Sequence, residues 1–140
     1  MLYYQVDRKR GDFMDLSAFK SFNFREGVPY LSITDNGVTF NKAVTLKMNK
    51  PEYTTFLIDR TGKRVVLKAC DENTQNAVKF FNKDRNTPIL SVRWNSRDLL
   101  NTLSQLMGWD LSKAGYRIPG TFYQADNLIL FDLNECIVIK

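Results

Sequence analysis

Clusters of basic side chains are the feature of this sequence with the clearest chemistry. They are Arg8, Lys9 and Arg10; Lys42, Lys47 and Lys50; Arg60, Lys63 and Arg64; and the pair Arg93 and Arg97. Ammonium and guanidinium groups bind phosphates, so clusters that converge in the fold would form a surface for a nucleic-acid backbone. Each cluster alone is also typical of a solvent-exposed turn or helix face, and both interpretations stay open at this point.

The excess positive charge is concentrated in one part of the chain. Residues 31–70 carry seven basic and three acidic groups, a net charge of +4, out of +5 for the whole sequence. Residues 71–140 carry eight of each, so their net charge is zero. A basic stretch of this kind attracts a nucleic-acid backbone, an anionic lipid or an acidic protein, and it is also typical of a solvent-exposed lysine-rich face.

Residue types that catalyse reactions are scarce. The sequence contains no histidine, which excludes the nucleophile–histidine pairs of acyl-transfer enzymes. Its seven glycines are dispersed, so no glycine-rich phosphate loop is present. The nearest carboxylates, Asp71 with Glu72 and Asp132 with Glu135, are more typical of element ends than of an acid–base pair. We therefore expect a protein that is not an enzyme.

The two cysteines give no sign of a metal site. Neither Cys70 nor Cys136 has a second cysteine near it in sequence. Each lies beside a strand-like apolar run, which is typical of a buried free thiol in a reducing compartment. No set of carboxylates has the spacing of a calcium loop. The sequence thus predicts no cofactor and no metal.

Aromatic side chains offer a second means of binding nucleic acid, because exposed rings stack on bases. The candidates are Tyr3, Tyr4, Tyr30, Tyr53, Trp94, Trp109 and Tyr123. The same rings are equally suited to a hydrophobic core.

The elements that would position these side chains are short strands and helices. In the first half we expect strands over 30–34 and 38–40, a helix over 42–49 with Asn41 as its N-cap, a hairpin over 54–58 and 65–69, and a helix over 71–81. In the second half we expect strands over 89–94, 116–118, 122–123, 128–133 and 137–139, and a helix that begins after Asn95 or Ser96. Phe13, Leu16, Phe19 and Phe22 or its neighbours are expected to form a helical stripe or a buried irregular segment.

Two parts of the sequence resemble each other. Residues 38–42 match 92–96 at an offset of 54, and part of the hairpin over 59–67 matches 125–130 at an offset of 63. Each strand–helix–hairpin unit is too small to bury its apolar face alone, so we expect two units to cover each other. The predicted fold class is therefore α+β, with two similar strand–helix–hairpin units packed about a pseudo-twofold axis as a single domain.

This interpretation divides the chain into four parts. Residues 1–30 are the N-terminal strand and irregular segment, 31–81 the first unit, 82–88 a polar linker containing a proline, and 89–140 the second unit. No apolar run approaches the ~20 residues that a membrane-spanning helix needs, and no secretory signal is visible. We expect a cytoplasmic protein that has no membrane partner.

Residues 33–70 resemble the AbrB-type swapped-hairpin module. The residues that carry this resemblance are Val38 to Ala43, Tyr53 to Ile58, and Asp59 to Lys68. The resemblance implies two such units paired into a barrel, and DNA binding through basic residues on the paired surface.

The whole chain also resembles small phage and mobile-element proteins of Gram-positive bacteria, through Val92 to Leu100. This resemblance implies a context that includes transcription modulators and inhibitors of host defence such as anti-CRISPR proteins. The sequence therefore predicts a non-enzymatic protein whose basic first half contacts DNA, RNA or a nucleic-acid-bound complex. The alternative is a protein-directed inhibitor of a host defence system, or an adaptor, and the oligomeric state stays open.

Overall fold

The structure is a computed structural model that describes residues 3–7, 12–21, 27–84 and 89–139. Its strands are β1 (Tyr3–Asp7), β2 (Asp12–Asp15), β3 (Tyr30–Thr34), β4 (Gly37–Phe40), β5 (Tyr53–Asp59), β6 (Arg64–Cys70), β7 (Val78–Lys79), β8 (Val92–Trp94), β9 (Gly115–Tyr123), β10 (Leu128–Asp132) and β11 (Ile137–Ile139). Its α-helices are α1 (Lys42–Lys47) and α2 (Arg97–Met107), and two 3₁₀ turns cover Gln124–Asp126 and Leu133–Glu135.

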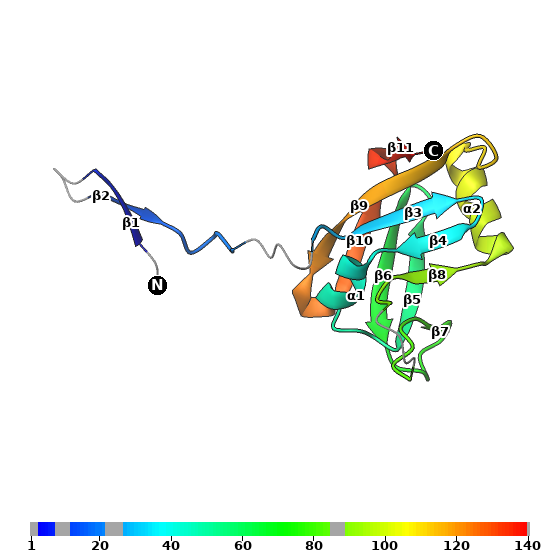
Figure 1. Cartoon of the computed structure of the whole chain (residues 1–140), viewed down its shortest axis with the longest axis horizontal. Coiled ribbons are helices and arrows are strands. Elements are labelled where there is room, and N and C mark those ends of the chain that lie inside the picture. The colour runs from blue at the N-terminus through cyan, green and yellow to red at the C-terminus, as the bar shows by residue number, and fades with distance from the viewer. Residues whose placement is uncertain (1–2, 8–11, 22–26, 85–88, 140) are drawn as a thin grey trace.

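Nearly all strands belong to one antiparallel sheet. Its order is β7-β5-β6-β10-β9-β3-β4-β8, with β11 beside β9, whereas β1 and β2 form a separate two-stranded sheet. Figure 1 shows this small sheet standing apart from the body of the molecule, which is a curled half-barrel.

The sheet curls about β9. The first half of this strand pairs with β3 on one side and β11 on the other, whereas its second half pairs with β10. The change of partner occurs at Gly120, where a Cβ atom would lie 2.5 Å from Ile129 Cγ2 and 2.7 Å from Phe131 Cε1. Only glycine leaves room for these two side chains on the inner side of the strand.

The concave side of the half-barrel holds the core. Alternation along β3 and β4 buries Leu31, Ile33, Val38 and Phe40, and β6 and β10 bury their alternate residues in the same way. The largest fully buried side chains include Phe40, Phe131, Leu31, Ile33, Met48, Leu67, Leu103, Ile118, Ile129 and Leu133. Members from β3, β6, β9 and β10 meet in this one cluster, so the curled sheet has a continuous core.

The two helices lie at opposite ends of the half-barrel (Figure 1). The carbonyl of Met48, at the end of α1, accepts a hydrogen bond from Asn127 Nδ2 in the turn between β9 and β10. The start of α2 lies at the other end, where Arg97 reaches Asp35 in the turn between β3 and β4. Ser96 caps α2, and Gly108 ends it in the left-handed conformation with φ 69°.

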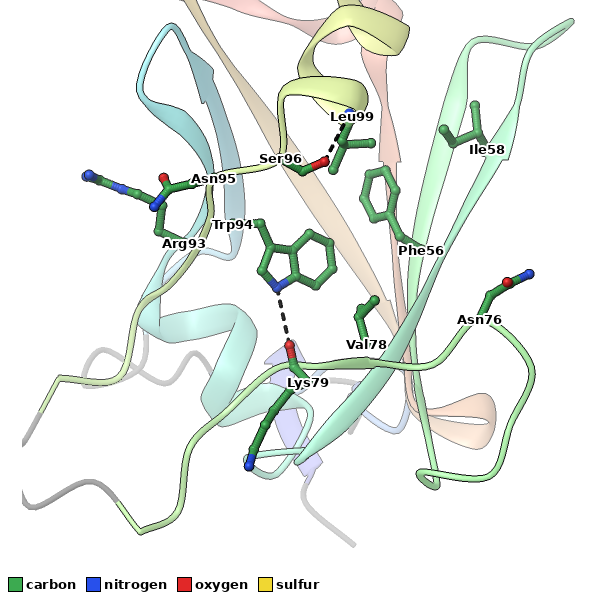
Figure 2. Close-up of a pocket in the computed structure, with 10 residues that line it drawn as sticks. All are labelled: Phe56, Ile58, Asn76, Val78, Lys79, Arg93, Trp94, Asn95, Ser96 and Leu99. Carbon is green, nitrogen blue, oxygen red and sulfur yellow. Dashed lines mark hydrogen bonds between the residues drawn. The ribbon is translucent and has the colours of Figure 1, made fainter.

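A seam separates the two ends of the sheet, β7 and β8. The Trp94 indole N–H donates to the Lys79 carbonyl across this seam over 3.4 Å (Figure 2). Phe40 packs edge-to-face against Phe80 and Trp94, with ring centroids 5.4 and 4.9 Å apart. Aromatic packing therefore holds the edges near each other without a ladder of backbone hydrogen bonds between them.

The α+β prediction of two strand–helix–hairpin units is wrong. The described chain is mostly antiparallel sheet, and α2 is its only helix longer than two turns. The segments compared at an offset of 54 pair with each other, as β4 and β8, and those compared at 63 do so as β6 and β10. The compared segments are thus neighbouring strands of one sheet, in which β10 and β9 of the second half lie between β6 and β3 of the first. Their apolar faces are buried in one core that both halves share.

Two local predictions also differ from the structure. Residues 71–81, expected as a helix, form turns and the short strand β7, because the Phe80 N–H donates to the Glu52 carbonyl at the edge of β5. Phe13 and Phe19, expected in a helical stripe or a buried segment, are 61% and 63% exposed, and Phe13 lies in the strand β2. Phe22 lies outside the described residues. The helix over 42–49 and the hairpin over 54–69 are present, with Asn41 as the N-cap of α1.

The described residues contain no helix that is both long enough and apolar enough to span a bilayer.

Candidate functional site

The structure disperses the predicted basic clusters. Arg8, Lys9 and Arg10 lie outside the described residues. The turn between β5 and β6 carries Arg60 and Lys63, with Arg64 at the start of β6. Lys42 begins α1, Lys47 ends it, and Lys50 follows two residues beyond Met48.

The end of α1 and the β5–β6 turn lie at opposite ends of β6. Asn127 Nδ2 donates to the carbonyl of Met48, and the Asn127 carbonyl accepts from the N–H of Ala69, near the last residue of β6. Arg64 is the first residue of the same strand. Seven residues of β-strand therefore separate these clusters, roughly 20 Å, and they do not form one continuous patch.

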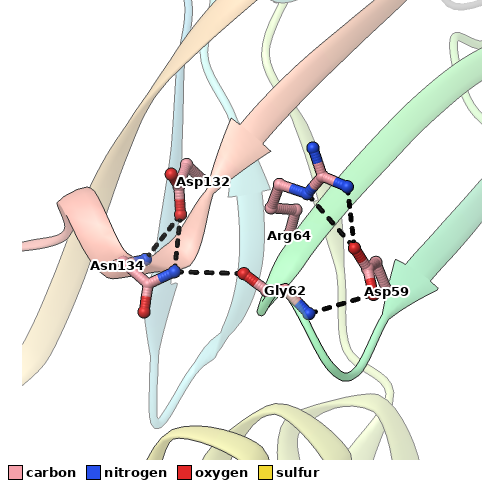
Figure 3. Close-up of polar contacts among 5 residues, drawn as sticks. All are labelled: Asp59, Gly62, Arg64, Asp132 and Asn134. Atoms are coloured by element: carbon pink, nitrogen blue, oxygen red, sulfur yellow. Dashed lines mark hydrogen bonds and ion pairs between the residues drawn. The ribbon is translucent and has the colours of Figure 1, made fainter.

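Asp59 organises the β5–β6 turn and neutralises one of its cations (Figure 3). One carboxylate oxygen accepts the Gly62 N–H at 3.0 Å, and the other accepts from Arg64 Nη2 at 2.8 Å and Nε at 3.2 Å. The Gly62 N–H, followed by the Arg64 guanidinium, lowers the pKa of Asp59 below its ordinary value of 3.8. Asp59 in turn raises the pKa of Arg64, so the pair stays ionised.

Arg97 is also ion-paired. Its Nη1 lies 3.3 Å from Asp35 Oδ1, and its Nη2 donates to the Asp35 carbonyl at 3.0 Å. These contacts fasten the start of α2 to the β3–β4 turn, which gives Arg97 a structural role.

A second group of cations surrounds a groove on the convex face of the sheet. The groove has a volume of about 690 Å³ and is lined by Gly27, Val28, Tyr30, Ser32, Thr39, Asn41, Lys42, Ile89, Leu90 and Ser91. We call it the outer-face groove, and none of these described lining residues is acidic. Its floor is the polar side of β3 and β4, and its wall is the segment before β8.

The sheet register places two arginines beside the outer-face groove. Arg93, Thr39, Ser32 and Arg117 are successive cross-strand partners on β8, β4, β3 and β9, so their side chains lie on one face. Arg93 Nε donates to Thr39 Oγ1 at 3.3 Å. The Arg117 guanidinium carbon lies 4.2 Å from the centre of the Tyr30 ring.

These cations differ from Arg64 and Arg97 in what surrounds them. Among the described residues, no carboxylate forms an ion pair with Lys42, Arg93 or Arg117. All three are exposed, and Tyr30 beside them is half-buried. The groove therefore combines positive charge that has no ion-pair partner among the described residues with an aromatic ring, one face of which the Arg117 guanidinium covers.

Asn41 positions this arrangement. Its Oδ1 accepts the Tyr30 N–H at 3.0 Å and the Val44 N–H at 3.4 Å, and its Nδ2 donates to the Val28 carbonyl at 2.8 Å. One amide thus caps α1 and fixes the chain that enters β3. Tyr30 and Lys42 are held on either side of the groove as a result.

Lys42, Arg93 and Tyr30 were candidates from the sequence, whereas Arg117 was not. Arg117 lies in the half with zero net charge, and the one basic residue near it in sequence is Lys113. It reaches Tyr30 only because β9 pairs with β3. The alternation of Tyr116, Arg117 and Ile118 in a predicted strand was the one signal that Arg117 faces solvent there.

Other chemistry has little support in the described part of the chain. No group of three or more cysteine, aspartate or glutamate residues there could hold a metal ion. Cys70 and Cys136 are free thiols and half-buried. The carboxylates with lowered pKa values, such as Asp59 and Asp110, accept hydrogen bonds from nearby turn residues.

Comparisons with family models, with characterised proteins and with solved structures found no match to this chain.

Proposed function

We propose that this protein binds single-stranded nucleic acid through the outer-face groove and is not an enzyme. The observation that carries the proposal is the stack of Arg117 on Tyr30 beside a groove whose cations have no ion-pair partner among the described residues. Proteins that bind single strands combine stacking surfaces for bases with positive charge for the backbone. The outer-face groove offers both on a rigid sheet.

The shape of the site favours a single strand over a duplex. Sequence readout of B-DNA requires a helix or a two-stranded ribbon that enters the major groove. The outer-face groove is bounded by Lys42, at the first turn of the six-residue α1, and presents the flat surface of β3 and β4. Ser32, Thr39 and Ser91 add hydroxyl groups, which donate to phosphate and sugar oxygens.

The cross-strand register of β8, β4, β3 and β9 separates two arginines along the proposed binding surface. Arg93 and Arg117 lie three strand spacings apart, on β8 and β9, which is roughly 14 Å across the sheet. Two arginines at this separation can hold different phosphates of one strand while a base stacks near Tyr30. The sequence predicted a basic binding surface in the first half of the chain. The surface proposed here combines Lys42 of the first half with Arg93 and Arg117 of the second.

The test is binding of fluorescein-labelled single-stranded DNA, single-stranded RNA and duplex DNA, measured by anisotropy at low and moderate salt. Double variant Arg93→Glu/Arg117→Glu reverses two groove cations. Double variant Arg60→Glu/Lys63→Glu reverses two turn cations and changes the net charge by the same amount. We expect the groove variant to lose at least about tenfold in affinity and the turn variant to change by less than about threefold.

Two outcomes contradict the proposal. Equal losses in the two variants mean that net charge, and not the groove, governs binding. No binding of any oligonucleotide by the parent protein at low salt removes nucleic acid as the ligand. The protein-directed inhibitor of a host defence system then becomes the leading function, and its test is capture of a stoichiometric complex that survives nuclease treatment.

A further inference from the structure

A second groove, which shares Arg93 with the proposed nucleic-acid site, opens at the seam of the half-barrel. Its volume is about 580 Å³, and its apolar lining comes from Phe56 and Ile58 on β5, Val78 on β7, Trp94 on β8, and Leu99 on α2. Figure 2 shows these side chains converging from both sides of the seam. We call it the seam groove.

Backbone groups at the seam lack a strand partner. β5 pairs with β6 along its full length but with β7 only at Tyr53 and Thr54. The Glu52 carbonyl already points toward this edge, where it accepts the Phe80 N–H at 2.7 Å. Because alternate residues of a strand direct their backbone groups to the same edge, those of Phe56 and Ile58 point into the seam. An edge of this kind is a template for another strand.

The chain carries a segment that suits this edge. β2 and the residues after it expose large apolar side chains: Phe13 is 61% exposed, Met14 46% and Phe19 63%. β2 pairs only with β1, and an isolated two-stranded sheet is marginally stable in water. We call residues 12–19 the arm.

Charge also matches the arm to the seam groove. The sequence of the arm places Asp12 and Asp15 on either side of Phe13 and Met14 and contains no basic residue. None of the described residues lining the seam groove is acidic, and Lys79 and Arg93 lie at its rims with their side chains directed away from the apolar lining (Figure 2). An acidic strand with an apolar centre therefore fits this edge better than a basic one.

We propose that the arm of a second copy of this chain occupies the seam groove. The arm adds as a strand to the free edge of β5, and Phe13 covers Phe56 and Trp94. Main-chain hydrogen bonds provide affinity in such strand additions, and side-chain pockets provide specificity. Reciprocal exchange of two arms gives a closed dimer with twofold symmetry. This proposal does not depend on nucleic-acid binding.

Sedimentation velocity across a wide concentration range is the first test. We expect the parent protein to dimerise, and Phe13→Ser/Phe19→Ser to weaken dimerisation by at least about 100-fold. Val78→Asp, which places a carboxylate opposite the acidic arm, is expected to have a similar effect. The control is Ile137→Ser/Val138→Ser, which removes two other exposed apolar side chains, 59% and 64% exposed, and should leave the dimer intact.

Mixing the variants distinguishes exchange between chains from docking within one chain. The Val78→Asp protein has an intact arm, and the Phe13→Ser/Phe19→Ser protein has an intact groove, so an equimolar mixture should form a heterodimer through one contact. A parent protein that is monomeric at every concentration, a dimer that persists in the arm variant, or a mixture that stays monomeric overturns the proposal.

Fluorescence provides a readout that does not depend on the groove variant folding. Trp109→Phe leaves Trp94 as the only tryptophan. Its emission should shift to longer wavelength on dilution in step with dissociation, because the arm no longer covers the indole. An emission spectrum that is independent of concentration while the dimer dissociates would falsify the placement of the arm at Trp94.

Discussion

The outer-face groove and the β5–β6 turn each present three basic residues, yet their surroundings differ. Lys42 lines a groove that has no acidic lining residue among those described, and Arg93 and Arg117 lie beside this groove in the sheet. Arg64 in the turn is bound to Asp59 by two hydrogen bonds. Asn41 organises the groove with a neutral amide, whereas Asp59 organises the turn with a carboxylate. Clustered charge in the sequence thus stays available at the surface only where no carboxylate pairs with it. Among the described residues of the turn, Asp59 pairs with Arg64 and not with Arg60 or Lys63.

The largest effect is expected for Asn41→Ala. Three hydrogen bonds to the backbone of Val28, Tyr30 and Val44 would be lost, and the free energy of unfolding should fall by about 2 kcal/mol. Urea denaturation measures the change. Asn101→Ala, an exposed position on α2, is the control and should stay within about 0.5 kcal/mol of the parent protein.

The second largest effect is expected at the Tyr30 ring, because residues 59–64 of the β5–β6 turn include no aromatic residue. Tyr30→Ala removes the stacking surface and should weaken binding of a single-stranded oligonucleotide by roughly 5- to 30-fold, about 1–2 kcal/mol. Tyr30→Phe keeps the ring and should bind almost as the parent protein does. Tyr123→Ala, a 47% exposed ring outside the groove, tests whether any surface aromatic would serve. A similar loss there would remove the distinction between the two regions.

The dependence of oligonucleotide affinity on salt concentration should also distinguish the groove arginines from the turn cations. Each phosphate contact with a single strand contributes about 0.7 to the slope of log affinity against log salt. Arg93→Gln and Arg117→Gln should each reduce that slope by about this amount, whereas Arg60→Gln and Lys63→Gln should leave it unchanged. An unchanged slope in both groove variants would show that these arginines do not contact phosphate.

The smallest effect is the pH dependence of the turn. The folded state lowers the pKa of Asp59, so its carboxylate stabilises the fold above the ordinary pKa of 3.8 and loses that contribution as pH falls through the lower folded value. Asp59→Asn should therefore be less stable than the parent protein at pH 7, and this difference should narrow below pH 3.8. Urea denaturation at pH 7 and pH 3 compares the two proteins. A constant difference would mean that the carboxylate charge contributes nothing.

Elements specified by neighbouring residues could be predicted from the sequence. The Asp59–Gly62 turn set the β5–β6 hairpin, and Ser96 with Gly108 set the bounds of α2. Residues 71–81 could not be predicted in this way, because Phe80 is placed by the edge of β5 and not by its own neighbours. The predicted fold class was wrong for the same reason, because paired strands such as β9 and β3 are far apart in sequence.

The residues of the candidate site also differ in whether the sequence could predict them. Lys42 and Arg93 belong to short clusters that can be seen in the sequence. Lys42 lines the outer-face groove, and Arg93 lies beside it, where it donates to Thr39. The pairing of Arg64 with Asp59 lies within the predicted hairpin, whereas the inclusion of Arg117 could not be predicted, because it depends on the pairing of β9 with β3. The sequence shows which side chains are basic. The cross-strand register determines which of these basic side chains lie on one surface.

The central position of β9 has a consequence for how this protein is made. Ile118 pairs with Leu31, which precedes it by 87 residues (118 − 31), so the sheet cannot close around β9 until the ribosome has synthesised that strand. Until then the nascent chain holds the apolar faces of β3, β4 and β6 exposed, as proteins rich in distant contacts do while they fold. Closure of this half-barrel is therefore a late step of folding, because it needs strands that are far apart in the described chain.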